Sequence, residues 1–269
     1  MNTNLKQKRV VITPVFNEEE NIVHILNQII TRTTFLIIIN DGSTDSSKEK
    51  IEEWKRDKKG VFFISYDINQ GASTALKKGY AFVRYLWQKG LIGPDDLIIE
   101  MDSDGQHDPL YIDVLSERFI KLENYDVVLG RRDFSNYPLY KKIGNKGLTI
   151  IASTLGGFKY KDVESNFRVT RTRVLVEILD YFIGYRYSGA FEFGIISGRL
   201  GHRIDNGSEI KVPLYRSGTN LWDGFHVLVT GIIACIKVLF KIRNRSIDEF
   251  CGLAVSEWTE YSRNKQGSL

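Results

Sequence analysis

The sequence predicts an α/β fold built on a doubly wound, mostly parallel sheet that is flanked by helices. Five short apolar runs are rich in β-branched residues, and helix-length segments of mixed polarity separate the first four of them. Continuous apolar runs of this length are typical of parallel strands that are buried on both faces. Because right-handed crossovers place the intervening helices on both sides of such strands, the alternation indicates a doubly wound sheet.

The predicted elements of the first half alternate strictly. Strands are expected at residues 9–16, 35–39, 61–66, 97–101 and 126–130. Helices are expected at 18–30, 43–55 and 72–87, and the first of them opens with the capping-box spacing of Asn17 and Glu20. The second half is less regular: glycines interrupt 140–160, a strand and helices are expected within 162–200, and a short strand within 204–216.

The composition is that of an ordinary globular protein. With 42% hydrophobic and 26% charged residues, it excludes disordered and fibrous classes. The formal net charge of +4 is small and no basic run alternates with aromatic residues, so we expect no nucleic-acid partner. Cys235 and Cys251 lack metal-site spacing, and no signal-peptide core precedes the first strand. A cytoplasmic location without disulfide bonds is therefore expected.

Polar, charged or glycine residues follow each predicted strand. They occupy positions 17–18, 41–43, 69–71, 102–104 and 131–132. In open α/β sheets, the loops beyond the carboxyl ends of the strands meet at one edge and form the ligand site. We therefore expect these five loops to surround a single site.

The segment MDSDGQHDP at 101–109 carries the strongest chemical signal. Residues two apart in an extended chain point the same way, so Asp102 and Asp104 present two carboxylates to one side. Hard divalent cations such as Mg²⁺ bind one or two protein carboxylates and complete their shell with phosphate and water oxygens. Gln106 offers a further carbonyl oxygen. An acidic turn that only caps the next helix, which Pro109 would begin, is the structural alternative.

Several catalytic motifs are absent from the sequence. It contains no G-x-x-x-x-G-K-[ST] phosphate loop and no G-x-G-x-x-G after the first strand. It also contains no H-E-x-x-H and no G-x-S-x-G. The sequence therefore does not meet the motifs of P-loop enzymes, dinucleotide oxidoreductases, zinc proteases or serine hydrolases.

The chain resembles glycosyltransferase family 2, and within it the dolichyl-phosphate mannosyltransferase-like and polyprenyl-phosphate glycosyltransferase branch. The matching segments are TPVFNEEENI (13–22), NDGSTDSS (40–47), NQGASTALKKGY (69–80), MDSDGQHDP (101–109), LGRR (129–132), SNFRVTRTRV (165–174) and VPLYRSGTN (212–220). The resemblance implies a GT-A domain in residues 1–220 and a C-terminal amphipathic helical segment in 221–269. Two positions depart from the pattern: Asn166 stands where the family often has glycine, and Thr219–Asn220–Leu221 replace the usual Ser-Lys ending.

The resemblance also implies a UDP- or GDP-sugar donor and a bound Mg²⁺ or Mn²⁺. The residues expected at the donor are Pro14, Phe16, Asn17, Glu18, Asp41, Gly71, Asp102, Ser103 and Asp104. The metal is expected on Asp102, Asp104 and Gln106. The residues expected to act in catalysis are Asp104, Arg131, Arg168 and Glu192, with the two arginines near phosphate groups, where guanidinium forks bind well.

Members of this branch invert the anomeric centre in one displacement, and the acceptor decides whether a base is needed. A lipid-linked phosphate acceptor is already anionic and needs no strong base. A sugar hydroxyl of a growing polysaccharide would need one, and Glu192, Asp162 or Glu164 could serve. Two alternatives therefore stay open: the hydroxyl acceptor, and a non-catalytic sugar-nucleotide-binding or scaffold protein.

The run at 224–240 is the most apolar part of the chain. It is shorter than the roughly 20 residues that a spanning helix needs. On a helix, Asp223, His226, Thr230 and Lys237 form one narrow polar stripe, and 241–245 adds positive charge. The pattern favours a helix that lies on the cytoplasmic face of the plasma (inner) membrane, over a core helix or a true span.

Overall fold

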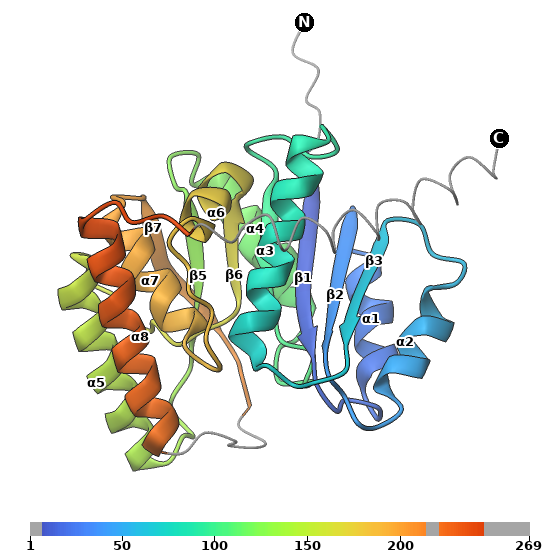
Figure 1. Ribbon diagram of the computed structural model, residues 1–269, viewed down its shortest axis with the longest axis horizontal. Coiled ribbons are helices and arrows are strands. Elements are labelled where there is room, and N and C mark those ends of the chain that lie inside the picture. Colours follow the sequence, from blue (N-terminus) through green and yellow to red (C-terminus); the bar gives the residue numbers. More distant parts are fainter. Residues whose placement is uncertain (1–6, 214–220, 245–269) are drawn as a thin grey trace, which may run out of the picture.

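The computed structural model describes residues 7–213 and 221–244 as a single sheet covered by helices on both faces (Figure 1). The strands are β1 (Arg9–Val15), β2 (Phe35–Asp41), β3 (Val61–Tyr66), β4 (Leu97–Glu100), β5 (Val127–Arg132), β6 (Arg168–Arg171) and β7 (Ile204–Ile210). The helices are α1 (Ile22–Ile30), α2 (Ser47–Lys55), α3 (Ala72–Gln88), α4 (Leu110–Lys121), α5 (Leu139–Gly156), α6 (Thr172–Leu179), α7 (Gly189–Arg199) and α8 (Leu221–Leu239).

The sheet has the strand order β3-β2-β1-β4-β6-β5-β7. All pairs are parallel except those of β6, which runs antiparallel to both β4 and β5. The predicted doubly wound, mostly parallel sheet and the C-terminal helix are therefore confirmed, and β6 makes the sheet mixed. This strand brings the segment 165–168 between the end of β4 and the end of β5.

Alternate residues of the strands fill two hydrophobic clusters, one on each face of the sheet. Val10 and Ile12 face the cluster beneath α3, α6, α7 and α8. Val11 and Val15 face the cluster beneath α1, α2 and α4. This alternation is the reason that the central strands are apolar throughout, because each strand is covered on both sides.

Two helices begin later than the sequence predicts. Asn17 adopts a left-handed conformation, with φ of 54°, and its carboxamide oxygen accepts the N–H of Thr44 at 2.8 Å. The expected capping box is therefore wrong, and α1 begins only at Ile22. Likewise α2 begins at Ser47 rather than at 43, because residues 43–46 form the loop that Asn17 contacts. A side chain that bonds to a neighbouring loop competes with capping.

Helix α5 runs unbroken through the glycine-containing stretch. Gly144 and Gly147 lie within it, and nothing packs within 4 Å of the place where a Cβ would stand at either position. The helix ends where Gly157 takes the left-handed conformation that suits a C-terminal cap. The glycines inside α5 therefore weaken the helix without ending it.

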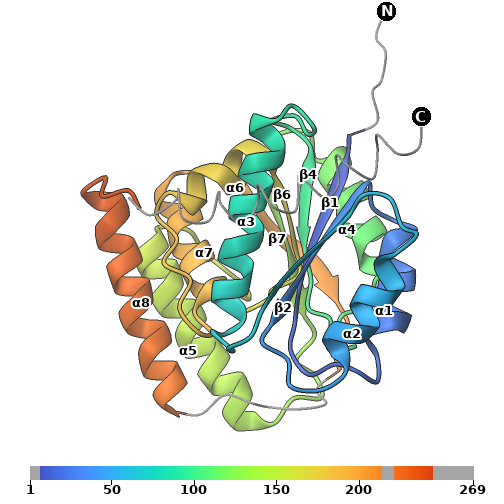
Figure 2. The same ribbon diagram turned by 45° about the vertical axis from the view of Figure 1, so that its right-hand side comes forward.

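Helix α8 lies beside α5 and α7 at one end of the molecule, as both views show (Figures 1 and 2). Ala234 and Cys235 of α8 are buried in the same cluster as α3 and α7. A Cβ at Gly231 would approach the Phe191 ring to 2.3 Å, so glycine allows this close packing. The division between a domain of 1–220 and a segment of 221–269 stays a prediction, and residues 214–220 and 245–269 lie outside the described residues.

Candidate active site

A pocket opens at the carboxyl ends of β1, β2 and β4, beside the N-terminal end of α3. Its volume, with the open mouth included, is about 520 Å³. Its lining residues come from four loops and one distant segment: Pro14, Val15, Phe16, Glu18, Asp41, Asn69, Gly71, Ala72, Asp102, Ser103, Asp104 and Tyr187. Eight of the nine residues predicted at the donor therefore gather here, and Asn17 does not line the pocket.

The loop after β4 holds its two carboxylates by local hydrogen bonds. The backbone N–H of Asp102 donates to Nδ1 of the buried His107 at 3.0 Å. The hydroxyl of Ser103 donates to the carbonyl of Pro14 at 2.7 Å, which ties this loop to the end of β1. Asp104 accepts the backbone N–H of Gln106 at 2.9 Å. The sequence spacing therefore becomes a fixed loop at the mouth of the pocket.

The electrostatics of this loop favour a cation. Burial raises the pKa of Asp102 and of Asp104, and the charge of Asp102 raises the pKa of Asp104 further. Burial also lowers the pKa of His107 to about 4, so the ring stays neutral and accepts the Asp102 amide. Two carboxylates that are desolvated and close together repel each other, and a divalent cation between them relieves that repulsion.

The oxygen ligands at this place fit a hard cation that completes its coordination shell with substrate oxygens. Within residues 7–213 and 221–244, no three His, Cys, Asp or Glu side chains gather as a closed metal site. Asp102 and Asp104 are the two carboxylates that this part of the chain offers at the pocket mouth, and Mg²⁺ sites with substrate phosphates commonly have one or two. Gln106 donates its amide N–H to Asp104 at 2.5 Å, so it supports a carboxylate and is not placed as a third ligand.

Asp41 organises the opposite wall of the pocket. Its carboxylate accepts the backbone N–H of Gln70 and of Gly71, each at 2.8 Å, and the side-chain N–H of Asn69 at 3.2 Å. Gly71 has a φ of 94°, and a Cβ there would approach Cα of Arg186 to 2.6 Å. Only glycine fits this turn, because the backbone of a segment more than 100 residues away packs directly against it.

The two arginines at the end of β5 point in different directions, and this corrects the prediction for Arg131. Arg131 forms an ion pair with Glu209 of β7. Arg132 instead donates to Asp162 at 2.8 Å and to Asn145 at 2.8 Å. Its positive charge offsets part of the rise that burial causes in the pKa of Asp102. Successive strand residues face opposite sides, so only Arg132 turns towards the carboxylate pair.

Arg168 lies beneath the site, and its guanidinium is bound within the protein. Its side chain is 1% exposed and pairs with Glu100 at 2.8 and 2.5 Å. The hydroxyl of Tyr80 donates to the same carboxylate at 2.6 Å. The expected contact between Arg168 and a phosphate is therefore corrected: this guanidinium neutralises a buried carboxylate that directly precedes the Asp102 loop, and its charge lowers the pKa of Asp102.

Of the three candidate bases, Asp162 and Glu192 are buried and Glu164 is partly exposed. Asp162 is bound by Arg132. Glu192 accepts the backbone N–H of Ile183 at 2.8 Å and of Gly184 at 3.2 Å, so it holds a loop and does not enter the pocket. Glu164 has one oxygen, Oε1, that is buried without a hydrogen-bond partner, and burial raises its pKa to about 7. The predicted catalytic role of Glu192 therefore has no geometric support.

Three further residues lie at or beside the site but were not named as site residues from the sequence, although the loop of Asn69 was expected there. Asn166, which departs from the family pattern, donates to Asp102 at 3.4 Å. Asn69 lines the pocket, and its place in a loop after a strand was the available signal. Tyr187 also lines the pocket, but it lies between helices rather than after a strand. No sequence signal indicated Tyr187, because only the tertiary path of the chain brings it to Gly71.

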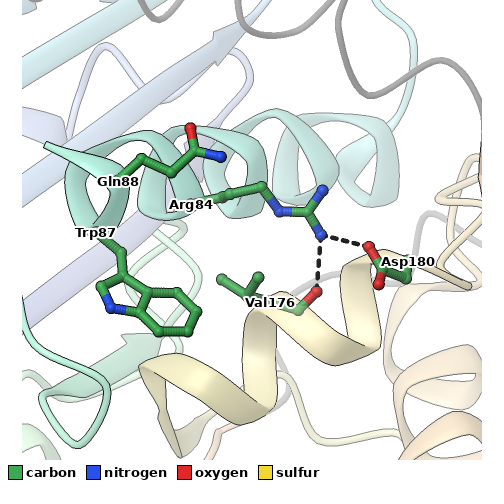
Figure 3. A pocket seen from close by; sticks show the side chains of 5 residues that line it. All are labelled: Arg84, Trp87, Gln88, Val176 and Asp180. Carbon is green, nitrogen blue, oxygen red and sulfur yellow. Dashed lines mark hydrogen bonds and ion pairs between the residues drawn. The ribbon is translucent and has the colours of Figure 1, made fainter.

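A second pocket lies between α3 and α6 (Figure 3). Arg84 donates there to the carboxylate of Asp180 at 2.5 Å and to the carbonyl of Val176 at 2.9 Å. Trp87 and Gln88 complete the lining. This pocket is at the C-terminal end of α3, opposite the first one, and its single carboxylate is already paired. It therefore offers no cation site.

Comparisons with known proteins agree with this geometry. The sequence profile of Glycosyl transferase family 2 matches residues 10–182, which is more than half of the chain. The chain belongs to glycosyltransferase family 2. Since its relatives carry the names of glycosyltransferases, the protein is a glycosyltransferase enzyme, and those relatives include dolichyl-phosphate and undecaprenyl-phosphate transferases.

Two relatives illustrate this family 2 branch. A UDP-N-acetylglucosamine–dolichyl-phosphate N-acetylglucosaminyltransferase of Methanococcus voltae is 29% identical over 244 residues, which cover 81% of this chain and 92% of the relative. A dolichyl-phosphate beta-glucosyltransferase of Trichomonas vaginalis is 24% identical over 253 residues, covering 86% and 72%. The resemblance to the polyprenyl-phosphate branch of family 2 is thereby confirmed.

Solved structures share the fold of this family 2 enzyme. Glucosyl-3-phosphoglycerate synthase from Mycobacterium tuberculosis, in complex with Mn²⁺, uridine diphosphate and phosphoglyceric acid, superposes with a TM-score of 0.62. The two chains are 17% identical, and the match covers 86% of this chain and 79% of the other. At this identity the likeness shows the GT-A fold alone.

Proposed function

We propose that this family 2 enzyme is an inverting, metal-dependent transferase that moves a sugar from a UDP- or GDP-sugar to a polyprenyl phosphate. The observation that carries the proposal is the pair Asp102 and Asp104 at the mouth of a pocket built from the strand-end loops. The structural neighbour that holds Mn²⁺ and uridine diphosphate has the same fold and supports this choice of donor and metal. Transfer to lipid phosphates by the relatives supports the acceptor.

Residues of the pocket would hold the nucleotide sugar at its base and at its diphosphate. Phe16 is 44% exposed at the pocket and offers a ring face to a nucleotide base. Asp102 and Asp104 would hold Mg²⁺ or Mn²⁺ on the diphosphate, and the Ser103–Pro14 hydrogen bond keeps them facing the pocket. The bound cation supplies neutralisation of the charge that grows on the departing nucleoside diphosphate.

The side of the pocket next to β5 suits an anionic acceptor. Arg132 does not line the pocket, but its charge acts on the pocket residue Asp102. Lys141, in the first turn of α5, is close enough to Arg132 that this charge lowers the pKa of Lys141 in addition to the effect of burial. The N-terminal end of a helix adds a partial positive charge. A lipid phosphate would bring its own nucleophilic oxygen, so no base is required at this place.

The lipid part of such an acceptor has a matching surface on α5 and α8. We call this surface the α5/α8 face; its exposed apolar residues are Leu139, Tyr140, Ile143, Ile150 and Ile151 of α5, and Trp222, Phe225, Val229, Ile232, Ile233, Ile236 and Leu239 of α8. Their spacing of three and four residues gives one stripe on each helix. An exposed apolar patch of two adjacent helices is typical of a membrane or protein contact.

The α5/α8 face begins at the edge of the sheet that carries the pocket. Leu139 and Trp222, at 72% and 74%, are among its most exposed residues and stand at the first turns of the two helices. Asp223 pairs with Arg186, whose backbone touches Gly71 of the pocket wall. A lipid lying on this face would therefore reach the pocket without crossing the molecule.

Attachment to the membrane surface, on its cytoplasmic side, completes the proposal. Among the described helices, α8 alone passes a length and composition test for a membrane span, with a mean hydropathy of 1.5 over Trp222–Leu239, and 39% of that stretch is buried inside the protein. The buried part of α8 packs on α7, which favours a helix that lies in the interface between the membrane and water. Lys241 and Arg243 follow it and suit anionic headgroups.

A sugar hydroxyl is the second candidate acceptor, and Glu164 is the observation that favours it. Glu164 lies outside the lining of the pocket but close enough to Arg132 to feel its charge, and one of its oxygens, Oε1, has no hydrogen-bond partner; burial also raises its pKa to about 7, which suits a general base. Glu164→Gln separates the two: a phosphate acceptor leaves the rate nearly unchanged, whereas a hydroxyl acceptor predicts a loss on the order of 100-fold or more.

The test is transfer of radiolabelled sugar from a panel of UDP- and GDP-sugars to undecaprenyl phosphate and dolichyl phosphate in vesicles. With Mn²⁺, label is expected in the organic phase for one donor, and EDTA should abolish it. Asp104→Asn should also abolish it, whereas Asp108→Asn in the same loop should not. Slow donor hydrolysis without lipid label would move the acceptor to a hydroxyl, and no nucleotide binding at all would overturn the proposal.

A further inference from the structure

The segment Ile183–Ser188, between α6 and α7, is built as a rigid wall of the pocket; we call it the 183–188 loop. Three of its residues, Tyr185, Arg186 and Tyr187, are exposed. Tyr187 lines the pocket, whereas Tyr185 packs edge-on against His226 of α8 with ring centroids 5.6 Å apart. Tyr187, which is 44% exposed, and Tyr185, which is 46% exposed, therefore face different surroundings.

Glu192 holds this loop from inside the protein. Its carboxylate is fully buried and accepts the backbone N–H of Ile183 and of Gly184, and the hydroxyl of Ser188. Helix α7 carries this residue in its first turn, so its position is fixed by the core. A buried carboxylate with several donors aimed at it constrains the loop that supplies those donors.

Helix α3 holds the loop from the other side. The N–H of Ser73 donates to the carbonyl of Arg186 at 2.8 Å, and the hydroxyl of Thr74 donates to the carbonyl of Gly184 at 2.9 Å. The ammonium of Lys77 donates to the carbonyl of Ile183 at 3.0 Å. The first two turns of α3 thus bind the loop directly behind Gly71.

The backbone of Arg186 shows that this placement is imposed. Its φ is 48°, which is uncommon for a residue other than glycine. Strained conformations persist only when the surroundings over-determine them, and they cluster at functional sites. The contacts from Ser73, Glu192 and Gly71 supply that constraint here, and their combined effect is to set the side chain of Tyr187 at the pocket.

We infer that Tyr187 is a contact residue for the nucleotide donor and that Glu192 is the positioning residue that places it. This inference rests on the proposed function and deepens it, because it adds a fifth, non-local wall to the donor site. An aromatic ring with a hydroxyl offers both a face for stacking and a hydrogen bond to the nucleoside diphosphate. Glu192 acts through the loop and does not touch the substrate.

The first test is calorimetric titration of the full chain with UDP and, in parallel, with GDP, each with Mn²⁺. Tyr187→Ala should weaken binding of the preferred nucleotide about tenfold, which corresponds to about 1.4 kcal/mol. Tyr185→Ala, the matched control on the same loop, should stay within about twofold of wild type. If Tyr187→Ala binds like wild type, or both variants weaken equally, the inference is wrong.

Failure of the proposed function gives a different pattern. If the wild-type chain binds neither nucleotide, the proposed function fails and the inference falls with it. If the wild-type chain binds and only Tyr187→Ala is unchanged, the proposed function stands and the inference alone fails.

The role of Glu192 needs a separate readout, because a base would also be sensitive to substitution. Glu192→Gln should raise the donor KM about tenfold and leave kcat within a few-fold, and it should leave the pH profile of kcat unchanged. If Glu192→Gln folds poorly, Ser188→Ala serves as the second variant. It removes only one hydrogen bond to the carboxylate and should give a smaller rise in the donor KM. A loss confined to kcat in either variant would refute the positioning role.

Discussion

The two halves of the sheet present different surfaces to a substrate. In the half made by β3, β2, β1 and β4, every strand is parallel and every strand end carries polar residues around one pocket. In the half made by β6, β5 and β7, β6 runs antiparallel, and the helices α5 and α8 beside it leave an apolar face exposed. The contrast supports the proposed transfer from a nucleotide sugar to a lipid phosphate.

Buried charge is also distributed differently. In the first half, the carboxylates of Asp102 and Asp104 lie at the pocket mouth. In the second half, Asp162 and Glu192 are enclosed and used to hold an arginine and a loop. Acidic residues near one site therefore serve different ends, and Asp41, which lines the pocket and also holds the turn at Gly71, shows that one carboxylate can combine a place in the pocket with a structural role.

The largest expected effect is at the pocket mouth of the first half. Asp104→Asn should lower the transfer rate by about 100-fold or more, because the cation on the leaving diphosphate loses a ligand. A nucleotide at a hundred times its dissociation constant stabilises the protein by about 2.7 kcal/mol in total. Asp104→Asn should remove the part of this thermal stabilisation that depends on Mn²⁺. Asp108→Asn is the control, since the carboxamide oxygen of asparagine can still accept the N–H of Leu110. Equal stabilisation of Asp104→Asn and wild type would contradict the metal site.

The next effect sharpens the contrast between the two arginines of β5. Arg132→Gln should lower transfer about tenfold or more, and it should destabilise the fold by about 3 kcal/mol because Asp162 would remain buried without its partner. Arg131→Gln should change both quantities little, since its ion pair with Glu209 is exposed. Chemical denaturation and transfer assays on the two variants check this. Equal behaviour would mean that neither arginine faces the acceptor.

A smaller effect is expected on the α5/α8 face. Ile143→Glu together with Ile236→Glu should weaken binding to vesicles of anionic lipid about tenfold, because two charges would enter the apolar stripe, and nucleotide binding should be unchanged. Val114→Glu is the matched control, because Val114 is 51% exposed on α4, which covers the other face of the sheet. Flotation of the proteins with vesicles measures the difference, and similar loss in all variants would argue against this face.

The last effect is on stability as pH changes. Burial raises the pKa of Glu192 to about 7, so folding favours its protonated form. This contribution is fully present below about pH 4.5 and is lost as pH rises through 7, by at most about 3 kcal/mol. Urea denaturation of the metal-free protein at pH 5 and pH 7.5 should show the decrease. Glu192→Gln should make the decrease smaller, and Glu164, whose pKa burial also raises to about 7, should account for a remainder. A decrease equal to that of the wild type would mean that Glu192 does not contribute.

Much of the fold could be predicted because it rests on local patterns. The apolar runs that became β1 to β5 are each confirmed, since a strand covered on both faces must be apolar throughout. Helix starts were less accurate, because Asn17 bonds to Thr44 of another loop instead of capping α1. Residues 139–156 looked broken by glycine, but packing against α7 and α8 keeps α5 helical.

By itself, the sequence determined the parallel sheet, the edge at which its loops meet, and the carboxylate pair that spacing places on one side of that edge. Only the tertiary structure decided that Arg132 rather than Arg131 faces the pair, that Arg168 and Glu192 are buried supports, and that Tyr187 joins the pocket. The physical reason is that spacing fixes direction only within one strand or loop. Contacts between segments about 100 residues apart depend on how the whole chain packs.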